Sequence, residues 1–277
     1  MKGPLTLREN LFSINPRNAK NRGKFTAGLL KYRRAAMLKV DLHIHTADDT
    51  VDRISYSTHE LIDRAAELGY NAVAITLHDS QLDPAPYRDY AAARGIVLIP
   101  GIERTIQGRH VLLINFSQAA QDVVSFEDLA RLKARERGLV IAPHPFFPAG
   151  SALRGLLSRH AELFDAVEWN AMFTPRVNFN ILGERWARRH GKPMVGNGDV
   201  HRLEQLGTTY SLVDAEPNAD AICEAIAAGR VQVVARPHTF VNAGWLMAKL
   251  VASSLLPRPA SARRRTANLE PRTAVLD

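Results

Sequence analysis

A chain of 277 residues with 46% hydrophobic and 23% charged residues is long enough for one full α/β domain and has the composition of an ordinary globular protein. Its single cysteine, Cys223, excludes an intrachain disulfide and a cysteine-based zinc cluster, and it favours a reducing compartment such as the cytoplasm. The net charge of +8 does not by itself indicate a nucleic-acid-binding domain, because the basic residues are concentrated at the two chain ends.

The two ends of the chain carry this basic charge. Residues 1–39 hold ten Lys and Arg and one Glu, and residues 258–277 hold five Arg and two acids, which leaves 21 basic and 25 acidic residues between them. We expect a flexible basic arm at 1–36 and a disordered basic tail at 257–277. These tails make nucleic acid a candidate partner, with a purely solvated role as the alternative.

Strand and helix patterns alternate along residues 37–256. We expect strands at 38–45, 72–77, 96–99, 111–116, 139–142, 165–169, 193–196, 209–213 and 231–235. We expect helices near 57–68, 86–94, 125–137, 178–190, 219–228 and, packed on the domain or touching a membrane surface, 240–256. No stretch indicates a signal peptide or a transmembrane span. About seven such units predict a mainly parallel sheet that closes into a barrel.

Polar residues of the kind that bind metals stand at the ends of these strands. In the first strand, Val40, Leu42 and Ile44 alternate with Asp41, His43 and His45, and this period of two places both imidazoles on one face. The others are His78, Glu103, His144, Asp199 and His201. Because the carboxyl ends of barrel strands meet at one rim, the pattern predicts a metal cluster there. His110 begins its strand and fits only if that strand runs in the opposite direction.

Five motifs in this order resemble the PHP (polymerase and histidinol phosphatase) family over about residues 37–236. They are Asp41-Leu42-His43-Ile44-His45-Thr46, Ala74-Ile75-Thr76-Leu77-His78-Asp79, Pro100-Gly101-Ile102-Glu103, Ala142-Pro143-His144-Pro145 and Gly198-Asp199-Val200-His201. The resemblance implies a distorted (β/α)7 barrel that binds two or three divalent metals and hydrolyses phosphoesters. No partner domain is recognisable, which suggests a stand-alone member.

The resemblance also implies how the ligands are shared. One metal would take His43, His45, Glu103 and Asp199; a second would take Glu103 as a bridge with His110 and His144; a third would take a loop acid with His78 and His201. Asp49 and Asp52 are both candidates for the loop acid, with Asp49 preferred. Leu77 replaces the family's usual acid, so a carboxylate outside the ligand shell is missing. Histidine and carboxylate together suit Mn, Fe or Zn.

The expected activity is hydrolysis of a small phosphomonoester or a nucleotide by a metal-activated hydroxide. Glu103, Asp199 and His201 are the expected catalytic residues, and Arg176 is a candidate phosphate-binding residue. Phe146 and Phe147 could stack a base, although packing is the commoner role of such a pair. The alternatives are a phosphodiesterase that trims nucleic acid, a non-catalytic metal-binding module of the same fold and, with nothing pointing to a carbonyl substrate, a related amidohydrolase.

Overall fold

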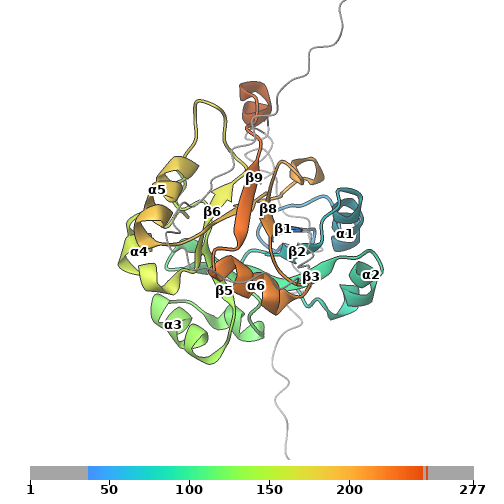
Figure 1. Ribbon diagram of the computed structural model, residues 1–277, viewed down its shortest axis with the longest axis horizontal. Helices are drawn as coiled ribbons and strands as arrows, with labels where there is room; N and C mark the ends of the chain where they lie inside the picture. Colours follow the sequence, from blue (N-terminus) through green and yellow to red (C-terminus); the bar gives the residue numbers. More distant parts are fainter. Residues whose placement is uncertain (1–36, 246–247, 249–277) are drawn as a thin grey trace, which may run out of the picture.

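Figure 1 shows the computed structural model of the protein, which describes residues 37–245 and 248. The expected basic arm and tail lie outside the described residues, as do 246–247 and 249–256 of the expected last helix. Within that helix, residues 240–245 and 248 are helical. None of the described helices combines the length and the apolar character that crossing a membrane requires.

Nine strands form one sheet in the order β7-β6-β5-β4-β3-β2-β1-β8-β9. They are β1 (Leu38–Ile44), β2 (Ala72–Ile75), β3 (Val97–Ile106), β4 (Arg109–Ile114), β5 (Leu139–Ala142), β6 (Ala166–Asn170), β7 (Met194–Asn197), β8 (Thr209–Val213) and β9 (Val231–Ala235). Neighbouring strands are parallel from β1 to β3 and from β5 to β7. Strand β4 runs antiparallel to both β3 and β5, as the position of His110 required.

The seven strands β1 to β7 curl into a nearly closed barrel. Just beyond β7, Val200 forms a parallel bridge with Ile44 of β1. The Val200 amide donates to the carbonyl of His43 at 3.1 Å, and the His45 amide donates to the carbonyl of Val200 at 3.0 Å. This bridge joins the two ends of the barrel at the rim that carries the predicted ligands. The expected α/β fold, a distorted (β/α)7 barrel, is confirmed, with the reversed β4 as its main distortion.

The helices lie around and below the strands (Figure 1). They are α1 (Thr58–Glu67), α2 (Arg88–Ala92), α3 (Phe126–Arg135), α4 (Gly155–Arg159), α5 (Asn180–His190) and α6 (Ala219–Ala227). Helix α1 begins with the capping box that Ser57 and Glu60 predict. Helix α4 was not predicted, because five residues are too short to show a helical period, whereas α2, equally short, is lengthened by the helical turn at Ala85–Tyr87.

The barrel interior is filled by apolar side chains at alternating strand positions. One cluster combines residues from β1 to β7, such as Val40, Ala72 and Ile141, with Ile222 and Ile226 of α6. Helix α6 therefore packs against the interior cluster. Two further clusters lie between the sheet and the helices, one with α1 and α2 and one with α3 and α5. The interior positions continue into polar residues at the rim, where the candidate site lies.

Replacing Gly196 of β7 with Ala should lower the free energy of unfolding by about 1–3 kcal/mol, because the added methyl group has no room. Its Cβ would lie 2.6 Å from the carbonyl oxygen of Tyr210 and 3.0 Å from Val233 Cγ1. Urea unfolding followed by circular dichroism measures the change. Gly150→Ala is the matched control, because no atom lies within 4 Å of its Cβ position. Equal stabilities of the two variants would contradict this account of the packing.

Candidate metal centre

The carboxylate of Glu103 stands at the centre of the site. Its side chain is 1% exposed, and the backbone bridge between Glu103 and His78 fixes its position beside β2. Five imidazole nitrogens lie within 3.4 Å of its two oxygens. Around Oε1 these are His110 Nδ1 at 2.7 Å and His144 Nε2 at 3.2 Å, and around Oε2 they are His78 Nε2 at 3.1 Å, His43 Nε2 at 3.4 Å and His45 Nε2 at 3.4 Å.

The sequence predicted that Glu103 would follow a strand ending at Ile99. In the structure β3 continues to Ile106, and Glu103 lies inside it. Gly101 allows this continuation, because a Cβ there would lie 2.8 Å from Thr76 Cγ2 on the neighbouring strand segment. The close approach of β2 and β3 then brings His78 to Glu103.

Asp199 and His201 approach the cluster from the end of β7. Asp199 Oδ1 lies 3.4 Å from the Nε2 of His43, 3.7 Å from the Nε2 of His45 and 3.4 Å from the Nδ1 of His201. Asp199 and His144 both have a positive φ, at 47° and 28°. Such conformations cost free energy and are concentrated at functional sites, where the surrounding structure maintains them.

The loop after β1 brings two carboxylates to the cluster in different ways. Asp49 Oδ2 lies 2.9 Å from the Nδ1 of His45 and 3.0 Å from the Nδ1 of His78, and it accepts the backbone amide of His78 at 3.0 Å. Asp49 Oδ1 accepts the amides of Val51 and Asp52. Both oxygens are therefore occupied. Asp52 Oδ2 instead lies 2.9 Å from the Nε2 of His201, and its side chain is 35% exposed.

Glu168 is a buried carboxylate that the sequence analysis did not single out. Its Oε1 lies 2.8 Å from His43 Nδ1 and accepts from Asn197 Nδ2, and its Oε2 accepts the His144 amide and Asn170 Nδ2. Glu168 therefore orients His43 through its ring nitrogen and His144 through its backbone amide. The available signal was its spacing of two from Ala166, which places Glu168 on the inward face of a buried strand.

Asp41 and Asn170 complete this outer layer of polar groups. Asp41 accepts from the backbone amides of His43 and Gly198, and burial raises its pKa to about 7. Asn170 Nδ2 donates to Asp199 Oδ2 at 3.0 Å as well as to Glu168. His43 of β1, His144 after β5 and Asp199 after β7 are thus each held by a further polar residue, which is typical of metal sites.

The electrostatics of the cluster favour ionised carboxylates and the protonated form of several of its imidazoles. Burial alone would raise the pKa of Glu103, yet the adjacent imidazoles, chiefly His43 and His110, hold the pKa well below its usual value. Burial would lower the pKa of His78, but hydrogen bonds to Asp49 and Glu103 raise the pKa to about 11. The carboxylates around His43 likewise raise its pKa against the effect of burial.

Not every imidazole in the cluster is a strong base. Burial, reinforced by the neighbouring His201, lowers the pKa of His45 to about 4 despite its hydrogen bond to Asp49. His144 and His201 have raised pKa values because nearby carboxylates outweigh burial. The carboxylates of the cluster thus place negative charge around its imidazole nitrogens. Such a set of ligand atoms can bind metal cations as well as protons.

The donor set fits divalent metal ions. Within the described residues, four groups of three side chains place ligand atoms within 4.8 Å of one another. They are His45, His78 and His201; His43, His144 and Asp199; His43, His45 and Glu103; and His78, Glu103 and His110. Among the described residues, four buried ring nitrogens of the cluster make no well-aligned hydrogen bond, although three of them lie close to a Glu103 oxygen: His43 Nε2, His45 Nε2, His110 Nδ1 and His144 Nδ1. Buried polar atoms without partners are rare in proteins, so these nitrogens point to ligands of the site.

The structure therefore brings together His43, His45, His78, Glu103, His110, His144, Asp199 and His201, as the sequence predicted. Asp49 and Asp52 both border the cluster. Arg176 lies exposed on the loop between β6 and α5, and no contact among the described residues joins it to the cluster. Arg104 binds Asp79 and the Val123 carbonyl instead of facing the site.

Comparison with known proteins identifies the fold. A two-domain protein from Bacteroides vulgatus, containing a predicted PHP-like metal-dependent phosphoesterase, aligns with a TM-score of 0.55 and 18% identity over 79% of this chain and 70% of that chain. The chain has the fold of the PHP-like phosphoesterases. PsfC from Pseudomonas syringae aligns with a TM-score of 0.55 and 16% identity over 80% of this chain and 100% of that chain.

A family profile, a solved endonuclease structure and a search of curated sequences give three further comparisons. A family profile described as PHP-associated matches residues 178–231, a stretch that includes Asp199 and His201 of the PHP-like barrel. The lesion-specific endonuclease PfuEndoQ from Pyrococcus furiosus aligns at a TM-score of 0.49 with 16% identity, over 76% of this chain and 66% of that chain. A search of curated protein sequences gives no match. The likeness to solved structures thus establishes the fold.

Proposed function

We propose that the protein is a metal-dependent hydrolase that acts on a small phosphoester, a phosphomonoester or a nucleotide. The observation that carries the proposal is the shell of five imidazoles around Glu103 at the rim of a PHP-like barrel, where several buried ring nitrogens make no well-aligned hydrogen bond within the described residues. A site of this kind concentrates cations at a position where a phosphate can enter. Fixed positive charge next to a phosphate stabilises the negative charge that develops during phosphoryl transfer.

We assign the ligands to three overlapping sets. They are His43, His45, Glu103 and Asp199; Glu103, His110 and His144; and His78, His201 and Asp52. Asp52 replaces Asp49 as the preferred loop ligand, because both oxygens of Asp49 are already occupied and Asp52 directs an oxygen to His201. The sets support two or three ions, and their histidine-rich composition favours Mn, Fe or Zn.

Bound ions of this kind would supply Lewis acidity and lower the pKa of a coordinated water. The protein's own residues prepare the place for that chemistry. Glu103 and Asp199 keep negative charge where the ligand sets meet, and Glu168 and Asp49 fix the orientation of the imidazoles. His201 lies nearer to solvent than Glu103, with 15% of its side chain exposed, and as a neutral ligand its ring would keep one N–H on the nitrogen that does not bind an ion.

The role of Arg176 in binding phosphate remains a prediction. Its loop follows β6 at the same rim as the cluster, and its exposed guanidinium is suited to two parallel hydrogen bonds with a phosphate. Arg176→Ala should raise KM with little change in kcat, because a residue that binds ground state and transition state alike affects KM.

The experiment that tests the function uses the full-length protein, depleted of metal and reloaded separately with Mn, Fe and Zn. Reloaded protein should hydrolyse members of a panel of p-nitrophenyl phosphate, nucleotides, histidinol phosphate and short oligonucleotides, and depleted protein should not. Bound metal without hydrolysis of any phosphoester would support the non-catalytic module. A preference for oligonucleotides with a steep salt dependence would support nucleic-acid trimming.

Metal loading should release protons, because metals bind neutral imidazole. The pKa of His78 is about 11 and those of His43, His144 and His201 are raised, so protons occupy the site at neutral pH. Apparent affinity should therefore rise with pH between about pH 6 and about pH 8. Titration calorimetry in buffers of different ionisation enthalpy measures the protons released. A binding heat that does not depend on the buffer would contradict the assignment.

A further inference from the structure

Exposed apolar side chains collect at the rim that carries the candidate metal centre. Among the described residues, eight large apolar side chains are exposed, and only Val124 lies outside three segments that leave the barrel at this rim. The other seven, here called the apolar rim, are Val51 after β1; Val177, Ile181 and Leu182 between β6 and the first turn of α5; and Phe240, Val241 and Trp245 in the helical segment after β9. Single exposed apolar side chains are ordinary, whereas a group in adjoining segments marks an interaction surface.

Strand β9 ends at this rim although it is not one of the seven barrel strands. Strand β8 runs antiparallel to both β1 and β9, so β9 runs in the same direction as β1. Ala235 at the end of β9 pairs with Thr209, whereas Leu38 at the start of β1 pairs with Val213 at the other end of β8. The helical segment after β9 therefore begins at the end of the barrel where β1 finishes.

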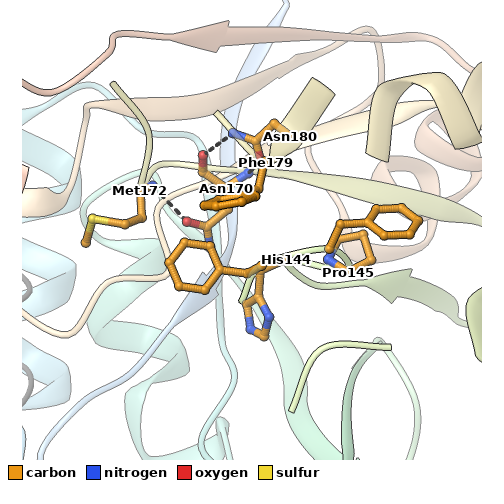
Figure 2. A pocket seen from close by; sticks show the side chains of 8 residues that line it. His144, Pro145, Asn170, Met172, Phe179 and Asn180 are labelled. Atoms are coloured by element: carbon orange, nitrogen blue, oxygen red, sulfur yellow. Dashed lines mark hydrogen bonds between the residues drawn. The ribbon is translucent and has the colours of Figure 1, made fainter. Parts of the chain in front are cut away.

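The segment after β9 contacts the connection between β6 and α5. The amide of His238 donates to the carbonyl of Phe173 at 2.9 Å. In that connection, the half-buried side chains of Met172 and Phe179 continue the apolar surface toward His144, a proposed metal ligand (Figure 2). The apolar side chains of these two segments thus lie along the same part of the rim.

The same segment also contacts the loop that carries His201. The guanidinium carbon of Arg202 lies 5.6 Å from the ring centre of Trp245. His201 lies 2.9 Å from Asp52, which follows Val51 in the loop after β1. The three apolar segments therefore adjoin one another beside the candidate metal centre.

Arginine side chains accompany the apolar ones. Arg53, Arg176 and Arg236 are exposed in the same three segments, and Arg202 is partly exposed next to them. Glu204 lies 3.4 Å from Arg202 and offsets part of this charge. The rim thus combines apolar groups with net positive charge among its exposed arginines.

The sequence after the helical segment adds more positive charge to this rim. Residues 249–277 contain six Lys and Arg and two acids, and they follow directly on the segment that carries Trp245. A second copy of the chain would bring like charges together here, whereas a bilayer with anionic lipids would bring the opposite charge. An anionic lipid surface therefore matches both the apolar side chains and the arginines.

We propose that the apolar rim docks on an anionic lipid bilayer. Phe240, Val241 and Trp245 enter the boundary between headgroups and acyl chains, where aromatic side chains are favoured, and the arginines meet the lipid phosphates. In this orientation the candidate metal centre faces the membrane surface. The docking does not depend on hydrolase activity, so it holds or fails separately from the function proposed above.

Sedimentation of the full-length protein with vesicles tests the proposal. The protein should bind vesicles of equal parts phosphatidylcholine and phosphatidylglycerol far more tightly than vesicles of phosphatidylcholine alone. Val241→Asp and Ile181→Asp should each weaken binding to the mixed vesicles about tenfold, because an apolar contact is replaced by a charge of the membrane's own sign. Val124→Asp is the matched control, since it makes the same change outside the apolar rim, and it should stay within about twofold. Thermal melting shows that each variant is folded.

Tryptophan fluorescence distinguishes docking through this rim from attachment by the basic arm at 1–36. Brominated lipids quench a tryptophan that enters the bilayer, so emission should fall when the protein binds brominated mixed vesicles. Trp245→Phe should remove most of this fall, because Trp245 is 48% exposed whereas Trp186 is buried and Trp169 is half-buried.

Three results would overturn the proposal. Vesicle binding without quenching, or equal binding of Val241→Asp and Val124→Asp, would show that the protein attaches to lipid without the apolar rim. Absence of vesicle binding would exclude the bilayer as the occupant. A dimer that Val241→Asp dissociates would then identify a second copy of the chain as the partner that covers this surface.

Discussion

Glu103→Gln should reduce phosphoesterase activity by on the order of a thousandfold and lower the number of metal ions bound. Glutamine keeps the shape of the side chain but removes the charge around which five imidazoles are arranged. Its amide would also place N–H groups against nitrogens that must remain free to bind a cation. Elemental analysis of metal-loaded protein, together with initial rates on p-nitrophenyl phosphate, measures both effects.

The control for this variant is Glu67→Gln, whose side chain is 64% exposed on α1. It should keep full metal content and activity. The melting temperatures of both proteins show whether Glu103→Gln remains folded. A folded Glu103→Gln protein with normal metal content and turnover would falsify the proposed centre, because no other carboxylate among the described residues touches so many of the predicted ligands.

Asp49→Asn and Asp52→Asn should have different effects on metal binding. Asp49 touches the Nδ1 atoms of His45 and His78, so its loss should weaken binding about 10- to 100-fold while saturating metal still fills every site. Asp52 is proposed as a ligand through the oxygen that faces His201. Asp52→Asn should therefore remove one ion even at saturation. Equilibrium dialysis over a range of metal concentrations distinguishes affinity from stoichiometry.

Asp48→Asn provides the matched control in the same loop. Asp48 accepts hydrogen bonds from the hydroxyls of Thr46 and Thr58 and does not touch an imidazole, so neither affinity nor stoichiometry should change. If Asp49→Asn loses an ion and Asp52→Asn keeps the full number, the roles of the two acids are reversed and the original preference for Asp49 is restored.

Asp49 also supplies a carboxylate beside His78, where the family motif usually has an acid at the position of Leu77. The sequence motif around Thr76-Leu77-His78 predicted that an acid outside the ligand shell was missing, and the loop after β1 supplies one from a different part of the chain. A sequence pattern cannot show such a substitution, because the acid is 29 residues away from His78 and reaches it only through the loop conformation.

The strand-end histidines could be predicted because two simple sequence patterns locate them. Alternation within β1 and the apolar runs before His78, His144 and Asp199 locate the carboxyl ends of parallel strands, which meet at one rim. Even the reversed β4 was foreseeable from the position of His110. These features depend only on the local sequence and on the rule that the carboxyl ends of parallel barrel strands lie at the same rim.

The residues that the sequence missed are those whose role depends on contacts between strands. Glu168 serves the site through His43 and His144, which lie 125 and 24 residues away along the chain. Asn170 acts through Asp199. A charged residue two positions after Ala166, in a strand that is otherwise apolar up to Trp169, was a usable signal, but the partners of Glu168 are set by the closure of the barrel.

The reversed strand β4 determines where this barrel can accept inserted residues near the candidate site. Strand β3 extends beyond the rim of the candidate site, the chain turns at Gln107 and Gly108, and β4 runs back into the barrel. The next connection, from 115 to 138, begins and ends at the opposite end of the barrel. Residues inserted at the tight turn would project over the candidate metal centre without altering strand order, whereas residues inserted after β4 would lengthen a connection that begins and ends at the other end of the barrel. The hairpin is thus a position where new substrate contacts can evolve while the barrel stays unchanged.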